Sequence, residues 1–518
     1  MKARACIRQY SSYRFLNLPA VQIRVYGFNQ KGEMSDTVSK YIVADAFLEA
    51  LAEAGVDYLF TVLGSDHPSI IEAYVRRTKL QGKELPRMIL FQHEFAAMSA
   101  ADGYARITHR PACVIVHVDV GTAALGQGLH NASSGRAPVV IFAGVAPSTL
   151  HGESAGSRSE HVQWYQDIPN QASLVAPYSR YTAEIKSAQH VQTVVHRAVL
   201  MATTGSPGPV YLTATREMLA APVESLEPRK RAIPSCHLGG LSANAVELVA
   251  DALIKAEAPL VITGYLGRNH QAVKNLVALV DIVKGIRVFD SEIREEKMNL
   301  FDIGATATFH ADSATALSQL TEYILKSGKI SADTYAKRWS AVQASFEEGQ
   351  KLVLSRALSA AETPDAPSTV DYLLHTLRSV VPDDTYFVSD SVTNQVLLSE
   401  QLRFTRPGSH LTKGGSGLGW AGGAAIGVKL ATKLYDLTDR PNIKHKDSND
   451  SSEEPLVYLG ISLELDGPNY GEVAKAAANG HLWTKRVTRV GDLKDVLIEA
   501  KKVVLEQKMS AVVDVIVK

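Results

Sequence analysis

The sequence has few cysteines, no long apolar run and no excess of either charge. Its three cysteines, Cys6, Cys113 and Cys236, lie far apart and form no CxxC pair, so neither a disulfide framework nor a zinc knuckle is indicated. The longest apolar run, near 138–147, has the length of a strand rather than of a membrane span. Lys plus Arg (54) equals Asp plus Glu (54), which gives no support to a protein that coats nucleic acid. The composition favours a cytoplasmic or mitochondrial protein with no nucleic-acid or membrane partner.

The length of the chain exceeds what one hydrophobic core supports. With 518 residues, of which 46% are apolar and 21% charged, the sequence is typical of a globular protein with two to four domains. We find no short-period repeat. Domain boundaries therefore have to be sought in changes of composition along the chain.

The amino-terminal segment has a composition of its own. Residues 1–32 contain six Lys and Arg, and the first acid is Glu33. A basic, acid-free and Ser-containing leader is typical of a mitochondrial transit peptide. Pro19 and Gly27 interrupt its helical pattern, so a disordered tail, or upstream sequence with Met34 as the working start, fits equally well. We treat residues 1–36 as a basic extension outside the fold.

From residue 40 onward, strands and helices alternate. Apolar spacing predicts a helix over 43–54 that ends at Gly55. The predicted strands are apolar throughout, which favours an α/β fold with a parallel sheet covered by helices on both faces. The strands are expected at 58–63, 87–91, 112–118, 138–143 and near 209–212, with an Ala-rich helix over 93–106.

Two stretches read as linkers and divide the chain into three blocks. Residues 216–240 are rich in Pro, Glu, Arg and Lys, and residues 355–369 in Ala, Ser and Pro. The second block starts at Ala243, contains strands at 259–263 and 286–289, and ends near Leu325. The third runs from Val370 to the end and includes a charged insert, 442–454, that predicts a solvated loop.

Two glycine motifs match known patterns without the context that those patterns require. Residues 152–156 (GESAG) match the GxSxG nucleophile elbow, but loop residues separate them from the preceding strand. Residues 417–422 (GLGWAG) match GxGxxG, but no strand ending in an acid follows about 20 residues later. A serine hydrolase using Ser154 is therefore a minor alternative, whereas a glycine-rich turn before a helix still suits a phosphate group.

A third pattern, 92–106 (QHEFAAMSAADGYAR), follows a predicted strand directly. Glu94 would open its helix at the carboxyl edge of the parallel sheet, where ligands bind in open α/β folds. A first-turn acid also has a purely structural explanation, because it interacts favourably with the helix dipole. The residues alone do not decide between these two explanations.

This segment closely resembles the HE-x-x-A-x-x-A-x-GYAR signature of thiamine-diphosphate enzymes of the acetolactate synthase and benzoylformate decarboxylase type. Collinear stretches are similar to other parts of the same family. The resemblance implies a three-domain α/β architecture with shortened middle and carboxyl-terminal domains. The stretches are 55–64, 121–144, 207–210, 259–264 and 414–427, and the implied domains are pyrimidine-binding (37–222), middle (239–335) and diphosphate-binding (366–518).

The resemblance also implies a chemistry. In the family, the glutamate matching Glu94 bonds the aminopyrimidine of thiamine diphosphate and favours the tautomer that removes the thiazolium C2 proton, so that the cofactor can attack a 2-keto acid. Leu418 matches the bulky apolar residue beneath the cofactor. A homodimer or homotetramer is implied, and FAD, which acetolactate synthases carry, is left open. The other implied cofactor-binding residues are Ser391, Thr393, Gly415, Ser416 and Gly417, and the substrate side is expected at Gly121, Thr122 and His130.

The chain departs from the family at the metal motif. The family has a Gly-Asp-Gly motif and a downstream Asn, and this Asp and Asn bind Mg²⁺. The motif is absent here, because the strand-like segment 455–460 is followed almost at once by 468–474, which resembles the family's late helix. Asp466 and Asn469 have the spacing of a β-turn rather than of a metal site. We therefore expect thiamine diphosphate to bind weakly or not at all. A non-catalytic relative that pairs with a full-length paralogue is the main alternative, and the metal ligands are unknown.

Overall fold

The computed structural model describes residues 41–223, 238–290, 304–437, 444–446, 456–459 and 468–517. The chain divides into Met1–Lys40 and Tyr41–Lys518, and all the described residues belong to the second unit. The basic extension, most of the predicted 216–240 linker, most of the charged insert and Asp466 lie outside the described residues.

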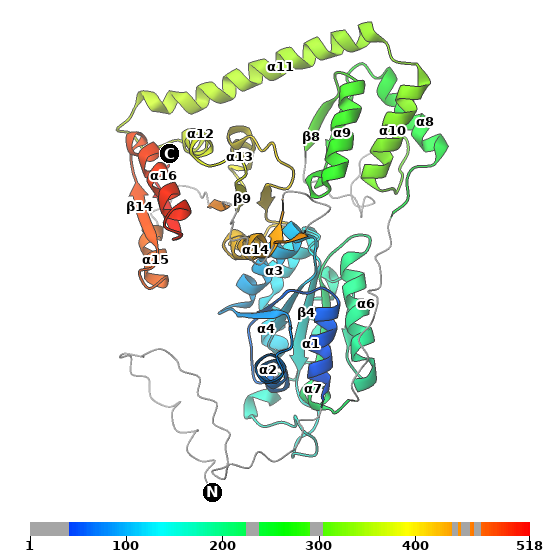
Figure 1. Cartoon of the computed structure of the whole chain (residues 1–518), viewed down its shortest axis with the longest axis vertical. Helices are drawn as coiled ribbons and strands as arrows, with labels where there is room; N and C mark the ends of the chain where they lie inside the picture. The colour runs from blue at the N-terminus through cyan, green and yellow to red at the C-terminus, as the bar shows by residue number, and fades with distance from the viewer. Residues whose placement is uncertain are drawn as a thin grey trace. The chain divides into compact units, whose positions relative to one another are not determined.

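A six-stranded sheet forms the centre of the first block (Figure 1). Every neighbouring pair in it is parallel, as the apolar strands predicted. The sequence analysis missed one edge strand, Thr182–Glu184, because three partly exposed residues give no apolar signal. In spatial order the strands are β2 (Arg87–Leu90), β1 (Tyr58–Thr61), β3 (Ala112–Val116), β4 (Val139–Val145), β6 (Val210–Thr215) and β5 (Thr182–Glu184).

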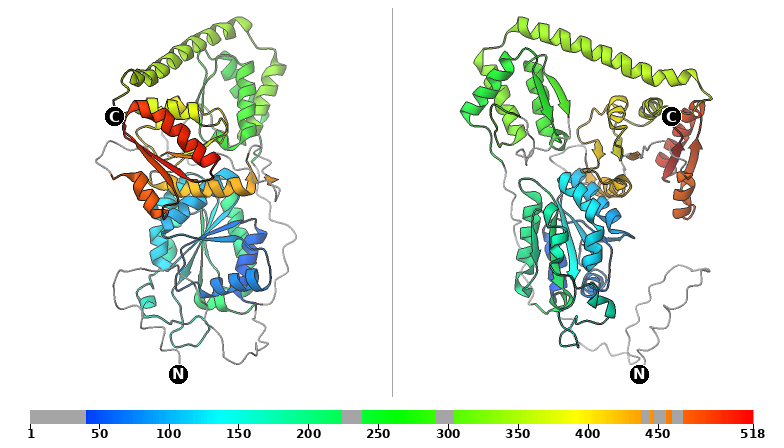
Figure 2. Two further views of the ribbon diagram at one scale, coloured as in Figure 1. Left: turned by 60° about the vertical axis from the view of Figure 1, so that its left-hand side comes forward. Right: turned by 180° about the vertical axis from the view of Figure 1, so that it is seen from behind.

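Helices cover both faces of this sheet, and alternate strand residues point to each (Figure 2). Leu59 and Cys113 face one core, whereas Phe60 and Val114 face the other. This is why the strands carry no polar alternation. The core that contains Leu59 is formed with α1 (Val43–Glu53), α2 (Pro68–Val75), α6 (Val191–Thr203) and α7 (Arg216–Ala220). The core that contains Phe60 is formed with α3 (Glu94–Thr108), α5 (Gly126–Ser134) and α14 (Trp420–Leu434). A further short helix, α4 (Val118–Ala124), follows β3.

The helix α14 comes from the third block yet belongs to the core of the first. It packs along α3 through small residues: a Cβ at Gly427 would lie 1.9 Å from the Ala100 carbonyl oxygen, and one at Gly103 would lie 2.4 Å from that of Ala424. Trp420 is fully buried, and its indole N–H donates to Asp102 at 2.6 Å. The first and third blocks therefore share one continuous core.

The second block is a small α/β layer with its own core. Its two parallel strands lie close to where the sequence predicted them. The predicted 355–369 linker is wrong in its first part, because a helix continues to Ser359: Ala357 is buried and Arg356 pairs with Asp371 and Glu400. The elements are α8 (Ala243–Lys255), β7 (Leu260–Thr263), α9 (His270–Ile282), β8 (Arg287–Asp290), α10 (Ser313–Ser327) and α11 (Ala332–Ser359).

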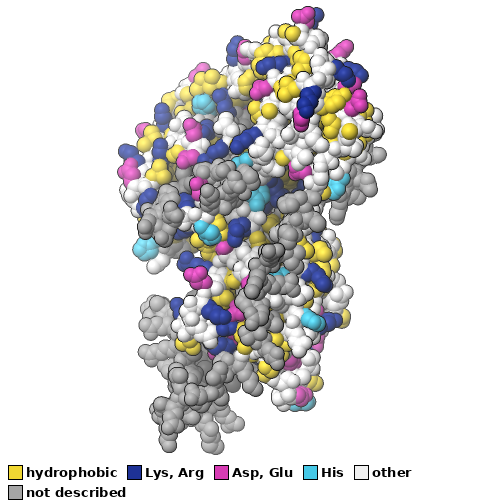
Figure 3. Space-filling view, turned by 45° about the vertical axis from the view of Figure 1, so that its right-hand side comes forward, with side chains coloured by type: hydrophobic (Ala, Val, Ile, Leu, Met, Phe, Trp, Pro, Cys, Tyr) yellow, Lys and Arg dark blue, Asp and Glu magenta, His cyan; other side chains and the backbone are white. Residues whose placement is uncertain are grey.

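The third block contains two small parallel sheets. Tyr435–Asp436 (β11) pairs antiparallel with Lys444–His445 (β12), so part of the region expected to be loop forms a strand pair. On the face seen in Figure 3, acidic and basic side chains are interspersed. The sheets are β10 (His410–Thr412), β9 (Tyr386–Ser389) and β13 (Leu456–Leu459), and β14 (Trp483–Val487) with β15 (Ala511–Val515); the helices are α12 (Val370–Val380), α13 (Gln395–Leu402), α15 (Tyr470–Ala477) and α16 (Val490–Leu505).

Candidate active site

Glu94 occupies the first turn of α3, directly after β2. His93 caps this helix through its Nδ1, which accepts the Phe95 N–H at 3.0 Å. The Glu94 side chain is half-buried, and a Cβ at Gly121 would lie 3.3 Å from its Oε1. The structure thus brings together two residues from separate predicted motifs, with a glycine that leaves room beside the carboxylate.

The glycine-rich loop before α14 lies against α5 of the first block. The side-chain amide of Asn131 binds both sides of Gly417, donating to its carbonyl at 2.9 Å and accepting its N–H at 3.0 Å. A Cβ at Gly415 would lie 2.2 Å from His130 Nδ1. His130, Gly415 and Gly417 are therefore neighbours. Asn131 was not predicted from the sequence, because its role depends on a contact between distant segments.

The end of β9 and the start of α14 form a second polar cluster. The Oδ2 atom of Asp390 accepts the Gly419 N–H at 2.6 Å, and the Lys413 ammonium donates to the Ser391 carbonyl at 3.0 Å. Ser391 is buried, whereas Leu418 is 57% exposed. Thr393 and Ser416 are also at least partly exposed.

The Thr122 hydroxyl faces a buried hydrogen-bond network. It donates to the Val118 carbonyl at 2.6 Å and lies 2.8 Å from the Tyr211 hydroxyl. The amide of Gln171 completes the network, donating to Tyr211 at 2.8 Å and to the Gly144 carbonyl at 2.9 Å. Within the pair Gly121–Thr122, the glycine borders Glu94 and the Thr122 hydroxyl joins this network.

Sequence reasoning missed an acid–histidine pair at the same sheet edge. One Asp66 carboxylate oxygen lies 2.6 Å from His117 Nδ1, and the other accepts the Val118 N–H at 3.1 Å. The other ring nitrogen of His117 lies 3.1 Å from the Gln166 side-chain amide. Val118 has a φ of 27°, a strained value for a β-branched residue. Such strain at the carboxyl ends of β1 and β3 indicates a functional position.

The environment of this pair changes the pKa of each group. Burial alone would lower the pKa of His117, but the hydrogen bond and negative charge of Asp66 outweigh it and raise that pKa. Burial alone would raise the pKa of Asp66, but the bond to His117 and the nearby histidine charges hold it below its usual range. Burial lowers the pKa of the neighbouring His67, whose Nδ1 accepts the Gly64 N–H. His117 is thus the group at this edge that is favoured to carry a proton.

The comparisons with known proteins concern mainly the first block. Residues 42–174 match the thiamine pyrophosphate enzyme N-terminal TPP binding domain. This part of the chain is therefore similar in sequence to the amino-terminal domain of thiamine pyrophosphate enzymes.

Similar proteins include acetolactate synthases. The Bacillus subtilis acetolactate synthase is 24% identical over 241 residues, 46% of this chain and 39% of that protein. The large subunit from Haemophilus influenzae is 29% identical over 174 residues, 34% of this chain and 28% of that protein. The chain thus spans less than half the length of these relatives. A structure from Mycobacterium smegmatis, described as a thiamin diphosphate-dependent enzyme, superposes with a TM-score of 0.68 at 18% identity. The superposition covers 92% of this chain and 99% of that chain, which shows that the two share a fold.

Within the described residues, the site offers a carboxylate suited to the pyrimidine side of thiamine diphosphate but no cluster suited to its usual metal. Glu94 presents this carboxylate beside the glycine position 121. Among the residues that the structure describes, however, no three His, Cys, Asp or Glu side chains gather to hold a metal ion. Asn469, the described half of the Asp466–Asn469 pair, caps α15 by accepting the Glu472 N–H at 3.1 Å. The described helices also include none long and apolar enough to cross a membrane.

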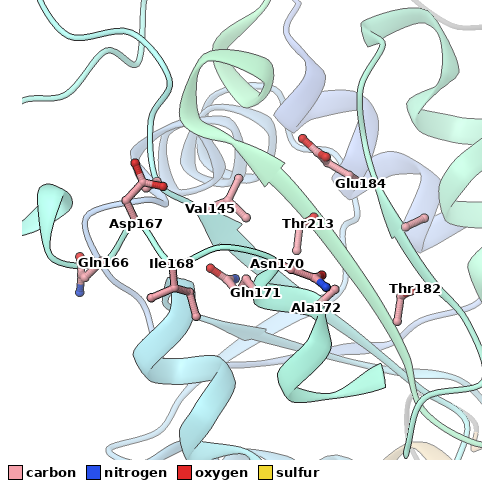
Figure 4. Close-up of a pocket in the computed structure, with 12 residues that line it drawn as sticks. Val145, Gln166, Asp167, Ile168, Asn170, Gln171, Ala172, Thr182, Glu184 and Thr213 are labelled. Carbon is pink, nitrogen blue, oxygen red and sulfur yellow. The ribbon is translucent and has the colours of Figure 1, made fainter. Parts of the chain in front are cut away.

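Figure 4 shows a cavity in the first block, with the residues that line it. Its volume is about 370 Å³, and it lies at the carboxyl ends of β4, β5 and β6. Gln166 lines it and also contacts His117, so the cavity and the pair share one side chain. Its other polar lining residues are Asp167, Asn170, Gln171, Thr182, Glu184 and Thr213.

Ser154 lacks the setting of a hydrolase nucleophile. The preceding strand, β4, ends at Val145, and Ser154 lies exposed in a turn in which its carbonyl accepts the Ser157 N–H. A nucleophile elbow needs the serine between a strand and a helix. The structure therefore contradicts the serine hydrolase alternative.

Replacing Asp66 with Asn tests the acid–histidine pair. Without the Asp66 carboxylate, only the more weakly acting charges of Asp119 and Glu160 oppose burial, so the pKa of His117 should fall, which histidine NMR titration would show. The pair stabilises the fold between two pH limits, the lowered pKa of Asp66 and the raised pKa of His117. As pH rises through the pKa of His117, its ring loses the proton and part of this stability is lost. The loss of thermal stability in Asp66→Asn should be larger near about pH 5.5 than near about pH 8.5. An unchanged titration of His117 would contradict the pairing.

Proposed function

We propose that this chain is a thiamine-diphosphate-dependent enzyme that decarboxylates a 2-keto acid, with or without ligation of the product to a second carbonyl compound. The observation that carries the proposal is the half-buried Glu94 carboxylate beside Gly121 at the carboxyl edge of the parallel sheet. Several relatives are acetolactate synthases, which supports this reaction class. The proposal includes the three-domain arrangement, with shortened middle and diphosphate-binding domains.

The residues of the site have separable roles in this proposal. Bound thiamine diphosphate supplies the group that holds the carbanion left by decarboxylation. Glu94 holds a proton at its carboxylate and exchanges it with the aminopyrimidine. His117, kept protonated by Asp66, serves as the proton donor on the substrate side. Asn131 fixes the loop that carries Leu418 beneath the cofactor.

We propose that the working form is a homodimer or homotetramer. Leu418 (57% exposed) lies next in sequence to Gly419, whose N–H binds Asp390, and Val392 and Val396 (both 65% exposed) follow Asp390 in sequence. Exposed apolar side chains close in sequence to such a polar cluster are typical of a surface that another subunit covers. A second copy would bury them and exclude water from the chemistry.

Assaying CO₂ release from a panel of 2-keto acids, with thiamine diphosphate supplied, tests the proposal. We expect saturable turnover of at least one acid, and loss of that turnover when the cofactor is omitted. No turnover by the purified chain, together with turnover after co-purification with a full-length paralogue, would favour the non-catalytic relative instead. The scarcity of metal ligands among the described residues is the observation that supports this second candidate.

A further inference from the structure

The cavity of Figure 4 is lined by a buried hydroxyl that the fold does not satisfy. Thr213, on β6, lines the cavity and is only 6% exposed. Within the described part of the chain, its hydroxyl has no hydrogen-bond partner. Most buried polar groups in folded proteins are paired, because leaving one unpaired costs free energy. With a volume of about 370 Å³, the cavity has room for a small molecule that would supply the missing partner.

The strand register places an acid beside this hydroxyl. Glu184, on the edge strand β5, pairs with Thr213 on the neighbouring parallel strand, so the two side chains stand next to each other on one face of the sheet. Thr182 lies two residues before Glu184 and therefore faces the same way. Its hydroxyl also has no hydrogen-bond partner among the described residues. A carboxylate and two hydroxyls, all lining the cavity, thus offer oxygen atoms at one wall.

The charges that line the cavity are negative. Asp167 and Glu184 lie on opposite sides of it in Figure 4, and none of its described lining residues is Lys or Arg. Asp167 pairs with Arg158, which does not line the cavity. Glu184 lies 3.4 Å from Lys186, but both side chains are exposed, and an ion pair of this kind contributes little. The lining therefore favours a cation and disfavours the carboxylate of a 2-keto acid.

The apolar part of the lining selects among cations. It consists of aliphatic side chains such as Val145, Ile168 and Ala172, and the described lining residues include no aromatic ring. Aromatic rings are what proteins typically use to recognise a quaternary ammonium group. A primary ammonium instead donates three hydrogen bonds, for which carboxylate and hydroxyl oxygens are suitable acceptors.

We propose that this cavity is a binding site for a primary aliphatic ammonium compound. Its nitrogen binds at Glu184 and Thr213, and its hydrocarbon body lies against the aliphatic wall. The site is distinct from the Glu94 carboxylate, so the proposal stands whether or not the chain decarboxylates a 2-keto acid.

Three compounds with four carbon atoms each test the charge preference. They are n-butylammonium, n-butanol and butyrate, titrated separately into the full chain at neutral pH and followed by ligand-observed NMR. We expect n-butylammonium to bind with a Kd of about 1 mM or tighter. The alcohol should bind at least about 10-fold more weakly, because it forms no charge-assisted hydrogen bond, and butyrate should show no binding.

Two variants locate the site. Thr213→Val keeps the shape of the side chain and should weaken n-butylammonium about 10-fold, the effect of losing one hydrogen bond to a charged group. It should not lower the melting temperature, because the hydroxyl has no partner in the fold. Glu184→Gln should weaken binding about 10- to 100-fold. Glu322→Gln is the matched control, since Glu322 is also an exposed acid paired with a lysine, and it should bind as wild type.

Four outcomes would overturn the proposal. They are no binding of n-butylammonium, equal binding of the ammonium and the alcohol, binding of butyrate, and an unchanged ammonium affinity in either Thr213→Val or Glu184→Gln. Binding of butyrate that Glu184→Gln strengthens would instead mark the cavity as a site for anions.

Discussion

Replacing Glu94 with glutamine is expected to lower turnover of a 2-keto acid by about 10²- to 10⁴-fold, the usual contribution of a positioned acid–base group. Glutamine has the shape of glutamate but cannot take up the proton that the aminopyrimidine exchanges. Stability should change by less than about 1 kcal/mol, because only the interaction of a first-turn acid with the helix dipole is lost. Steady-state kinetics and thermal melting of the same preparations measure both quantities.

Glu472→Gln is the matched control for this experiment. Glu472 is also a first-turn acid, but it lies exposed on α15, away from the sheet edge that carries Glu94. If Glu94 served only the helix dipole, the two substitutions would have similar small effects on stability and none on turnover. Full activity in Glu94→Gln would therefore remove Glu94 from the mechanism and, with it, the proposed function.

Replacing Gly427 with alanine should destabilise the protein by about 3 kcal/mol, the upper part of the range for overpacking a core. The added Cβ would lie 1.9 Å from the Ala100 carbonyl oxygen and 2.7 Å from the Tyr104 nitrogen. Both are backbone atoms of α3, which cannot rotate away as a side chain can. The shift in the urea midpoint, followed by the fluorescence of buried Trp420, measures the loss.

Gly422→Ala, in the same helix, provides the comparison. A Cβ at Gly422 meets no atom within 4 Å, so the substitution should stabilise α14 by about 0.5–1 kcal/mol through the lower flexibility of alanine in the unfolded chain. Equal effects at the two positions would mean that α14 and α3 do not pack closely in solution.

The sequence predicted the central elements well because their signals are local. The helix α1 and strands β1, β3 and β4 are confirmed within a few residues, since each is a continuous apolar or periodic segment. Glu94 could be identified from one motif, and its meeting with Gly121 follows from the rule that parallel strands present their carboxyl ends at one edge.

The missed features depend on contacts between distant residues. Asp66 and His117 are 51 positions apart, and Asn131 and Gly417 are 286 apart, so no local pattern marks either pair. Residues 355–359 have the composition of a linker, yet they continue α11 because Arg356 finds two acids and Ala357 a buried position. Local composition could not reveal these partners.

Because α14 packs on α3, the matched domain ends in the sequence long before the segment that completes its core. The stretch that matches a known domain ends at residue 174, and the six-stranded sheet is complete by residue 215. The face of α3 nevertheless stays uncovered until residues 420–434 have been synthesised. On the ribosome, the first block must therefore wait for roughly two hundred further residues before its second core is covered, and during this delay chaperones could bind the exposed face.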